Sequence, residues 1–532
     1  MNVENLNMWD KFMKWYREYP EIGLAIDLSR MNFPEDYLEK MLPKFQKAFK
    51  EMQELESGAI ANPDEHRMVG HYWLRAPELA PTEEIKNDII NTINDIKEFS
   101  REVHSGKIRG QTGVFKNLLV IGIGGSALGP QFVANALGNP SSDKMSVFFF
   151  DNTDPDGMDR VMSRLASRLG ETLVIVISKS GSTVETRNGM LEIKHAYKNA
   201  NLDFSQHGVA ITERGSKLDQ LAEKERWLKR FPMWEWVGGR TSETSAVGLL
   251  PAALQGIDID QVLDGARHCD RISRDFNVND NPSALLALAW FFAGNGKGEK
   301  DMVILPYKDR LELFSRYLQQ LVMESLGKET DKNGNVVHQG LVVYGNKGST
   351  DQHAFVQQLR DGPNNFFVTF IEVLLDRDGP SINVDNQVTS GDYLFGFLLG
   401  TRNALFEKDR LSLTITLKQV SPFSIGVLIA LFERAVGFYA SLININAYHQ
   451  PGVAAGKKGA DDIINLQRDI LKLLETKNKT PLTAEEIAHL LNKPNHIEIV
   501  FKICNHLSAN PYRNIKKSPG KTPFDARFSL TL

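Results

Sequence analysis

The apolar positions of this chain follow one spacing near its ends and another in its middle. Up to about residue 95 they recur every three or four residues, as at Met8, Trp9, Phe12 and Met13, which predicts amphipathic helices. Beyond Lys116 they gather into short, nearly unbroken runs separated by amphipathic stretches; the runs are 117–124, 145–151, 171–178 and 208–212. Continuous apolar strands that alternate with helices are typical of a parallel sheet covered on both faces.

A second series of apolar runs begins after the polar loop 273–283. Its strand candidates are 301–307, 341–345 and 365–375, and helices are predicted over 310–326 and 423–443. We therefore expect an α/β fold with two tandem domains, each a parallel sheet flanked by helices, between helical extensions at the two ends. The expected boundaries are 1–95 for the N-terminal extension, 96–275 and 276–459 for the two domains, and 460–532 for the C-terminal extension.

The C-terminal extension returns to helical spacing and ends in a basic stretch. It contains two short helix candidates, TAEEIAHLLNK and HIEIVFKICNHLS, and a tail at 510–530 that could form a small hairpin. Two short helices and a basic hairpin are compatible with a winged-helix DNA-binding domain. The simpler interpretation, which we favour at this point, is an extension that packs against the main body.

Composition narrows the class of protein. With 532 residues, 42 % hydrophobic and 24 % charged, the chain has the profile of a soluble globular protein. A net charge of −4 gives no global basic field, so we expect neither nucleic-acid nor membrane binding. The longest apolar stretches reach about a dozen residues, whereas a membrane span needs about 20. The only two cysteines, Cys269 and Cys504, are remote from each other, which favours a reducing, cytoplasmic location.

The first predicted domain opens with a glycine-rich turn directly after a strand. The turn reads VIGIGGSALGP and contains Gly122, Gly124, Gly125 and Ser126. Glycines at such a turn let the backbone approach a ligand, and the free N–H groups of the next helix attract an anion. A dinucleotide fingerprint is disfavoured, because Ala127 stands where its third glycine belongs.

A second loop of the same domain, SKSGSTVET at 178–186, also joins an apolar run to a helix candidate. It carries four hydroxyl side chains within six residues, together with Lys179. A helix N-terminus with this many donors can bind several phosphate oxygens at once. A plain N-capped loop would need one or two of these hydroxyls, so we favour a phosphate site.

Six motifs together resemble those of the glucose-6-phosphate isomerase family. They are VIGIGGSALGP, ISKSGSTVET, WVGGRTSETSAVGLLPA, QQLVMESLGK, STDQHAFVQQ and YHQPGVAAGKKG, in the family's order over about residues 110–460. The resemblance implies two tandem sugar isomerase (SIS) domains. It also implies reversible conversion of glucose 6-phosphate into fructose 6-phosphate, in glycolysis and gluconeogenesis, through ring opening and an enediolate, with no cofactor and no metal.

The resemblance implies four catalytic residues. Glu324 would carry the proton between C2 and C1, because a partly desolvated carboxylate can both remove and return it. His353 would assist ring opening, and Lys457 would act beside it on the ring oxygen. Arg240 would stabilise the enediolate with a permanent charge that does not join the proton transfer.

The same resemblance implies a substrate-binding set and an assembly. The hexose 6-phosphate would contact Gly125, Ser126, Ser178, Lys179, Ser180, Thr183, Gln320 and Gln450. Neutral amides and hydroxyls bind sugar and phosphate oxygens without adding charge. We expect a homodimer whose active site is shared across the interface, with His353 donated by the partner.

The chain departs from the family pattern near the predicted lysine. Ala454 stands where the family has a glutamate, Thr241 replaces an aromatic residue after Arg240, and His449 precedes the glutamine of the last motif. The adjacent Lys458 leaves an alternative register for Lys457. We expect altered support around the lysine, not loss of the chemistry.

Three other functions compete with this interpretation. A regulatory protein that only binds sugar phosphates would need the loops but not the full set of Glu324, His353, Arg240 and Lys457. An amidotransferase partner acting on amino-sugar phosphates is disfavoured, because residue 2 is Asn2 and not a cysteine nucleophile. A metal-dependent isomerase is disfavoured because no compact His/Asp/Glu pattern is present in the sequence.

Overall fold

The computed structural model describes residues 3–477 and 479–531, without the side chains of 3–7 and 453–458. The chain forms two compact units, Met1–His449 and Gln450–Leu532, and each is described by itself.

The first sheet of the larger unit is parallel throughout. Its strand order is β4-β3-β5-β6-β7. The strands are β3 (Asn117–Ile121), β4 (Ser146–Phe150), β5 (Thr172–Ile177), β6 (Gly208–Thr212) and β7 (Lys229–Pro232). Four of them confirm the predicted apolar runs, and β3, β5 and β6 are buried at every position. The short edge strand β7 was not predicted, because its sequence KRFP lacks the apolar run of a central strand.

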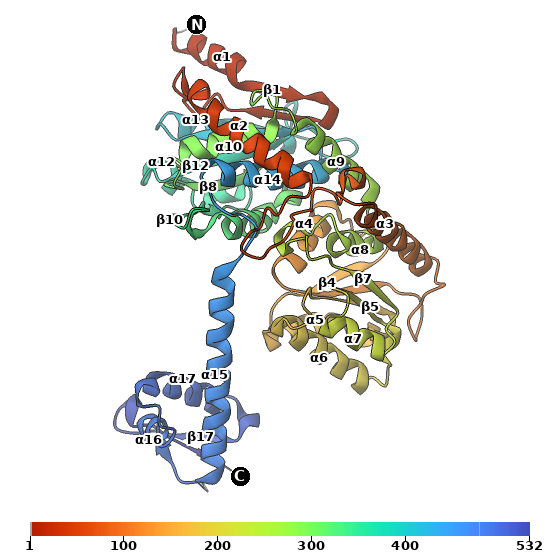
Figure 1. The fold of residues 1–532 in the computed structure, drawn as a ribbon, viewed down its shortest axis with the longest axis vertical. Coiled ribbons are helices and arrows are strands. Elements are labelled where there is room, and N and C mark those ends of the chain that lie inside the picture. The colour runs from red at the N-terminus through yellow and green to blue at the C-terminus, as the bar shows by residue number, and fades with distance from the viewer. Residues whose placement is uncertain (1–2, 478, 532) are drawn as a thin grey trace. The chain divides into compact units, whose positions relative to one another are not determined.

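Helices cover both faces of this sheet (Figure 1). On one side lie α5 (Pro155–Leu165), α6 (Val184–Asn199) and α7 (Lys217–Lys224), and on the other α3 (Glu83–His104), α4 (Leu128–Leu137) and α8 (Ala246–Gln255). The carboxyl ends of β3 and β5 lead into the two loops that the sequence singled out.

The second sheet is mixed, with the order β1-β2-β15-β12-β8-β11. Its parallel centre consists of β8 (Asp301–Pro306), β11 (Val343–Tyr344), β12 (Phe366–Val373) and β15 (Ser412–Leu417). The N-terminal hairpin of β1 (Tyr16–Tyr19) and β2 (Leu24–Asp27) adds to β15 in antiparallel orientation. The N-terminal segment is therefore not purely helical, although α1 (Val3–Trp15), α2 (Tyr37–Glu56) and α3 follow the predicted helical spacing.

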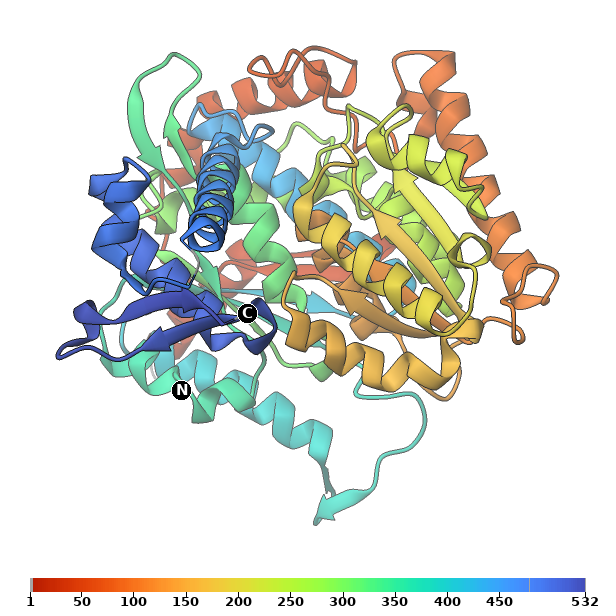
Figure 2. The same ribbon diagram turned by 90° about the horizontal axis from the view of Figure 1, so that it is seen from below.

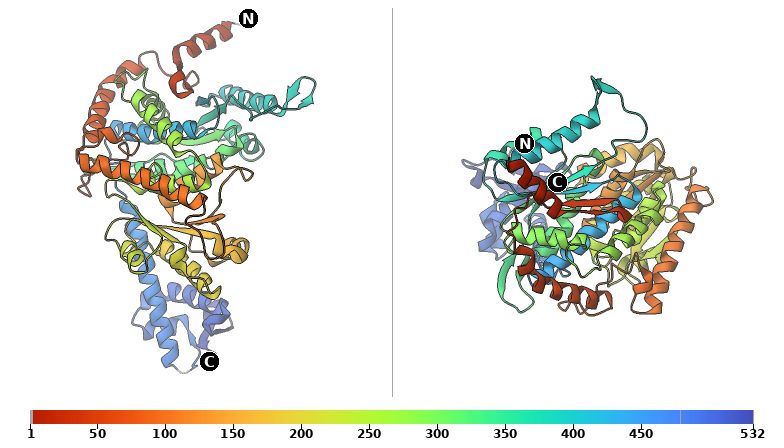
Figure 3. Two further views of the ribbon diagram at one scale, coloured as in Figure 1. Left: turned by 90° about the vertical axis from the view of Figure 1, so that its right-hand side faces the viewer. Right: turned by 90° about the horizontal axis from the view of Figure 1, so that it is seen from above.

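A long apolar helix, α14 (Pro422–Leu442), runs through the core of the larger unit (Figures 1 and 3). It packs against α2, α9 (Ile259–Ile272) and α10 (Pro282–Ala293). Among the described residues it is the one helix long and apolar enough to cross a membrane, yet 94 % of its most apolar window is buried inside the fold. That burial is the environment of a core helix.

Buried ion pairs tie α14 to α9 and to the loop that contains Arg75. The Arg75 guanidinium donates to Asp270 (Nε to Oδ2, 2.7 Å) and also pairs with Glu433 of α14. Arg434 donates to the other oxygen of the same Asp270 at 3.0 Å. Because buried charges are costly without partners, these contacts fix one relative arrangement of the two helices.

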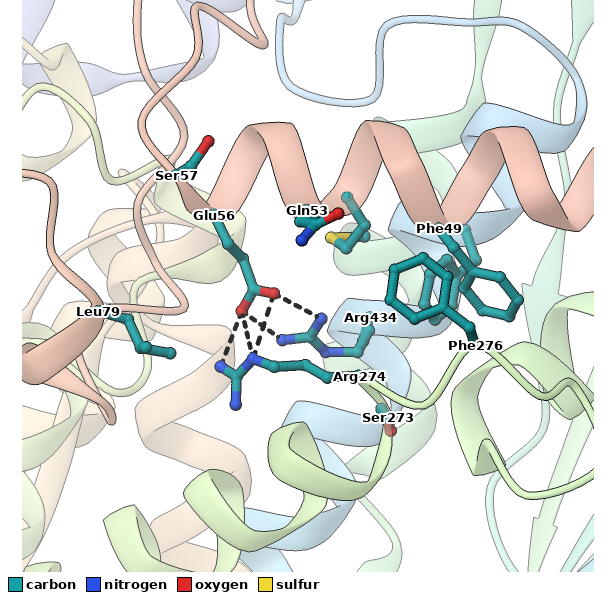
Figure 4. A pocket seen from close by; sticks show the side chains of 11 residues that line it. Phe49, Gln53, Glu56, Ser57, Leu79, Ser273, Arg274, Phe276 and Arg434 are labelled. Carbon is teal, nitrogen blue, oxygen red and sulfur yellow. Dashed lines mark hydrogen bonds and ion pairs between the residues drawn. The ribbon is translucent and has the colours of Figure 1, made fainter.

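Glu56, at the end of α2, extends this network toward the surface. Its carboxylate lies 2.7 Å from Arg434 Nη2 and 2.8 Å from Arg274 Nη2. Figure 4 shows the carboxylate between the two guanidinium groups, beside a pocket of about 340 Å³.

A projecting arm leaves the second sheet (Figures 2 and 3). It consists of the hairpin β13 (Asn383–Asp385) and β14 (Val388–Thr389) followed by α13 (Ser390–Phe406). Its exposed apolar residues are Ile382, Val384, Tyr393, Phe395 and Phe397. The remaining elements of the larger unit are α11 (Phe314–Leu318), α12 (Val356–Asp361), β9 (Lys328–Thr330) and β10 (Val336–Gln339).

The smaller unit has its own hydrophobic core. Its elements are α15 (Pro451–Thr476), β16 (Leu482–Thr483), α16 (Ala484–Leu490), α17 (Ile497–Ala509), β17 (Ile515–Ser518) and β18 (Arg527–Leu530). The antiparallel sheet has the order β16-β18-β17, and the predicted hairpin is confirmed as β17–β18. Residues from all three helices and the sheet, including Ile470, Ile487, Cys504 and Phe528, form one buried cluster.

Candidate active site

The predicted base, Glu324, ends a single turn of π-helix, Gln319–Glu324, that continues α11. Such a turn inserts an extra residue into a helix and is frequent at functional sites. Gln320, one turn earlier, donates its Nε2 to Glu324 Oε2 at 2.9 Å. The two side chains that the sequence selected from this motif therefore lie against each other.

Arg240 faces the same carboxylate from a 3₁₀ turn, Gly239–Thr241. Its Nε lies 3.8 Å from Glu324 Oε2. The other nitrogens donate to backbone oxygens, Nη1 to Ala447 and Nη2 to His449, both at 3.2 Å. Burial lowers the pKa of Arg240, and the charge of Glu324 opposes that shift. These two hydrogen bonds hold the guanidinium in place, and its Nε remains directed at the Glu324 carboxylate.

The first glycine loop packs directly on the Arg240 turn. A Cβ at Gly125 would lie 1.9 Å from Gly239 O and 3.0 Å from Arg240 N, so only glycine fits there. Gly124 has φ +58°, and a Cβ on it would lie 3.0 Å from Gln320 Nε2. Ser126 closes this turn just before α4. The loop, Arg240 and Gln320 consequently form one contiguous site.

The second loop is held by hydrogen bonds among its hydroxyl groups. Ser178 Oγ donates to Thr183 Oγ1 at 3.1 Å, and the Ser180 and Ser182 hydroxyls are 2.8 Å apart. Thr183 is the N-cap position of α6, but within the described structure its side chain makes no capping hydrogen bond. The hydroxyl oxygens and the first N–H groups of α6 are therefore available to an anion.

Lys179, in the same loop, turns its side chain away from the hydroxyl groups. Its Nζ donates to the backbone oxygens of Glu235 (2.8 Å) and Val237 (2.9 Å). Burial lowers the pKa of the Lys179 amine to about 8. The amine anchors the segment that leads to Arg240, and the backbone of Lys179 is the part that can face a ligand.

Lys328 is a member of the site that sequence reasoning did not select. Its Nζ donates to the backbone oxygen of Glu324 at 2.7 Å, four residues back in the chain. Burial and the nearby Arg240 lower the pKa of Lys328 to about 8, against the opposing charge of Glu324. The sequence feature that could have identified Lys328 is its position in the motif MESLGK, four residues after Glu324.

His449, noted only as a departure from the family pattern, also lies in this site. Its backbone oxygen accepts from Arg240, and its Nδ1 lies 3.8 Å from Asp64 Oδ2. Burial lowers the pKa of the His449 imidazole. Asp64 comes from a loop that sequence analysis did not connect with the site.

His353 is not brought to the Glu324 group within this chain. It is exposed at the end of a 3₁₀ turn, Thr350–His353. Asp351 fixes this turn by accepting from the backbone N–H of Asn346 at 2.7 Å. In the described part of the chain no hydrogen bond or ion pair joins the His353 side chain to another residue.

The remaining predicted residues belong to the smaller unit. Gln450 is exposed at the start of that unit, directly before α15. Lys457, together with Ala454 and Lys458, lies in the stretch 453–458, outside the described side chains.

Within the part of the chain that the structure describes, no three His, Cys, Asp or Glu side chains lie close enough together to hold a metal ion. The charged groups around Glu324 are instead the guanidinium of Arg240 and the amine of Lys328.

The two α/β sheets, with glycine- and hydroxyl-rich loops at the carboxyl ends of β3 and β5, place the chain among α/β proteins of the sugar isomerase type. The family model described as phosphoglucose isomerase matches residues 27–394 and 398–479. The chain belongs to the phosphoglucose isomerase family.

Known relatives cover almost the whole chain. It is 60 % identical over 527 residues to the glucose-6-phosphate isomerase of Geotalea daltonii, covering 99 % of each chain. It is 59 % identical over 504 residues to that of Nostoc punctiforme, covering 94 % of this chain and 95 % of the relative. The crystal structure of a glucose-6-phosphate isomerase from Chlamydia trachomatis superposes with a TM-score of 0.79 at 27 % identity, covering 88 % of this chain and 94 % of that one.

Proposed function

We propose that this chain is a glucose-6-phosphate isomerase, which interconverts glucose 6-phosphate and fructose 6-phosphate in glycolysis and gluconeogenesis. The single observation that carries the proposal is the contiguity of a phosphate-type loop, a fixed guanidinium and a carboxylate, through Gly125, Arg240 and Glu324. A binding protein without catalysis would not need a carboxylate faced by a buried arginine.

The two loops bind the phosphate of the substrate. Ser126, Ser178, Ser180 and Thr183 supply hydroxyl donors, and the N-termini of α4 and α6 supply backbone N–H groups. Gly125 and the backbone of Lys179 allow the phosphate to approach. Gln320 and Gln450 are proposed to bind sugar oxygens. Binding energy from the phosphate, which is remote from C1 and C2, then orients the reacting carbons.

Glu324 removes the proton from C2 and returns it to C1, while the hydroxyl proton of O2 moves to O1, so that the carbonyl shifts from C1 to C2. The resulting cis-enediolate carries developing negative charge on oxygen, which Arg240 stabilises without giving up a proton. The 2.9 Å bond from Gln320 and the Lys328 bond to the backbone of Glu324 keep the carboxylate aimed at the substrate. No metal ion and no organic cofactor enters this reaction.

Ring opening is assigned to His353 and Lys457, which pass a proton between the ring oxygen and the anomeric hydroxyl. His353 is exposed in its own chain, so we propose that it completes the active site of a partner subunit. The turn that contains it leads into α12, which packs on α13 of the apolar arm. Exposed apolar surface on a projecting arm is typical of a protein interface and supports a homodimer.

The proposed domain boundaries remain 1–95, 96–275, 276–459 and 460–532, and the proposed location is the cytoplasm. A coupled assay on the purified chain tests the function. With glucose 6-phosphate the product fructose 6-phosphate should form at enzymatic rates, with kcat of about 1–10³ s⁻¹. The same assay with mannose 6-phosphate defines substrate breadth. Tight binding of glucose 6-phosphate without turnover would favour the regulatory alternative.

A further inference from the structure

The smaller unit contains a pair of helices followed by a β-hairpin, an arrangement that occurs in DNA-binding domains. Its elements run α15, β16, α16, α17, β17, β18, and the strand order is β16-β18-β17 (Figure 1). This is the connectivity of a winged helix, in which the second helix of the pair enters a DNA groove and the hairpin, or wing, contacts the backbone. The family model ends at residue 479, so the pair and the hairpin lie outside the range that it matches.

The wing is strongly basic. Between Asn510 and Leu530 the basic residues are Arg513, Lys516, Lys517, Lys521 and Arg527, against the single acid Asp525. Asp525 is engaged by Thr522, whose N–H and hydroxyl donate to it at 3.0 and 2.8 Å. Arg527 pairs with Glu486 at 3.0 Å. The other four cations are exposed and, within the described structure, have no carboxylate partner.

The wing is joined to the exposed face of α17. Lys517 Nζ donates to Asn505 Oδ1 at 2.6 Å, and its charge lies 5.7 Å from the ring of Phe501. On the same helix Lys502 and His506 are exposed, and Glu498 pairs with Lys502 at 3.7 Å. Asparagine beside basic residues on a groove-facing helix is a usual means of contacting base edges.

Two large aromatic side chains are exposed beside the cations. Phe524 of the wing is 77 % exposed and Tyr512 is 70 % exposed. Proteins that bind the minor groove of DNA frequently insert apolar side chains between base steps. Phe524 lies beside Phe501 of α17, with ring centroids 6.2 Å apart, and Arg513 lies over the Tyr512 ring at 5.1 Å, so both rings stand among the groups of this basic surface.

We propose that α17 and the β17–β18 wing bind the phosphate backbone of double-stranded DNA, as a second activity of the chain. The expectation that it binds no nucleic acid rested on the net charge of −4, which averages an acidic larger unit with this local basic surface. Lys516, Lys517 and Lys521 supply phosphate contacts, and Asn505 and His506 lie on the helix face beside them.

Fluorescence anisotropy on the full chain tests the proposal, with a labelled random duplex of about 24 base pairs at about 50 mM KCl. Binding should be micromolar, and log K should fall linearly with log salt by about 0.9 per phosphate contacted. The triple variant Lys516→Glu/Lys517→Glu/Lys521→Glu should bind at least about tenfold more weakly and lower the salt slope by about three.

Two further variants are measured: a milder substitution of the same lysines, and a control elsewhere in the chain. Lys516→Gln/Lys517→Gln/Lys521→Gln removes the charges with less risk to the fold and should lose an intermediate amount of affinity. Lys198→Glu/Lys224→Glu/Lys408→Glu changes three exposed lysines of the larger unit and should bind DNA like the wild type. All three should keep isomerase activity and the wild-type circular dichroism spectrum.

Three results would overturn the proposal: no duplex binding at low salt, an equal loss in the control triple, or tighter binding of single-stranded RNA or of phosphatidylserine vesicles than of the duplex.

Discussion

Arg240 and Glu324 face each other at 3.8 Å, between the arginine Nε and the carboxylate Oε2, although 3.2 Å bonds to Ala447 and His449 hold the rest of the guanidinium. The arginine is buried and the glutamate is partly exposed, with side-chain exposures of 5 % and 18 %. The separation is longer than a tight ion pair, so the guanidinium is left free to face an enediolate oxygen beside the carboxylate.

Replacing Arg240 by lysine should lower kcat by about 10²–10³-fold, with a smaller change in KM. Lysine keeps the positive charge, but a single ammonium group cannot donate to the backbone oxygens of Ala447 and His449 and also face Glu324. Steady-state kinetics with glucose 6-phosphate measure the effect, and Arg168→Lys on the surface is the matched control. A wild-type kcat in Arg240→Lys would show that a positive charge alone, without the planar guanidinium, is enough for catalysis.

The substitution Gly125→Ala should lower kcat/KM by more than about 100-fold while the protein stays folded. The new methyl group meets Gly239 O at 1.9 Å, so the phosphate loop and the Arg240 turn must separate. Gly157→Ala, on α5 where a Cβ meets no atom closer than 3.4 Å, is the control and should be neutral or slightly stabilising. Full activity in Gly125→Ala would mean that the close packing of these loops does not matter.

The stability that Glu56 contributes should depend on pH. Burial alone would raise its pKa, but the charges and hydrogen bonds of Arg434 and Arg274 outweigh burial and hold the pKa below its ordinary value. An acid with a depressed folded pKa stabilises the protein above its unfolded pKa, and this stabilisation is lost as pH falls through the folded pKa. Glu56→Gln should therefore cost about 3 kcal/mol at about pH 7 and less at about pH 3, which is well below the ordinary carboxyl pKa.

Urea unfolding of the wild type and Glu56→Gln at the two pH values measures this difference. Glu54→Gln, on the exposed side of the same helix, should cost less than about 0.5 kcal/mol at either pH. A cost for Glu56→Gln that stays the same at both pH values would contradict the ionic account.

Much of the fold could be predicted from local pattern, and the missing parts have a common cause. The strands β3, β5 and β6 are buried on both faces, so each reads as an apolar run. The hairpin β1–β2 could not be read in this way, because it is short and its partner β15 lies nearly four hundred residues further along the chain. Its strand character depends on tertiary pairing, which no local window contains.

The residues of the site likewise fall into those that a motif identifies and those whose role depends on the folded structure. Glu324, Gln320 and Arg240 were found through their motifs, and the structure brings these three side chains together. Lys328 was missed because an exposed lysine and a buried one have the same sequence signature. The anchoring role of the Lys179 amine was also missed, since it depends on where the carbonyls of Glu235 and Val237 point.

Mixing two inactive variants should restore activity if His353 completes the site of a partner subunit. Glu324→Gln and His353→Ala chains, unfolded together and refolded in equal amounts, would form mixed dimers with one intact site in each. Recovery to about one quarter of wild-type activity is expected from random pairing. Either variant refolded alone should stay inactive. No recovery in the mixture, with dimers present by sedimentation, would place His353 in its own chain's site.

The most direct test of the whole account is the Glu324→Gln variant, measured for both turnover and binding. The amide keeps the shape of the side chain and its contact with Gln320, but it cannot take a proton from carbon. Isomerisation of glucose 6-phosphate should fall by at least about 10³-fold, while calorimetric affinity for a phosphorylated sugar acid stays within about threefold of wild type. Near-wild-type turnover in this variant would show that another group is the base, and the central claim would fail.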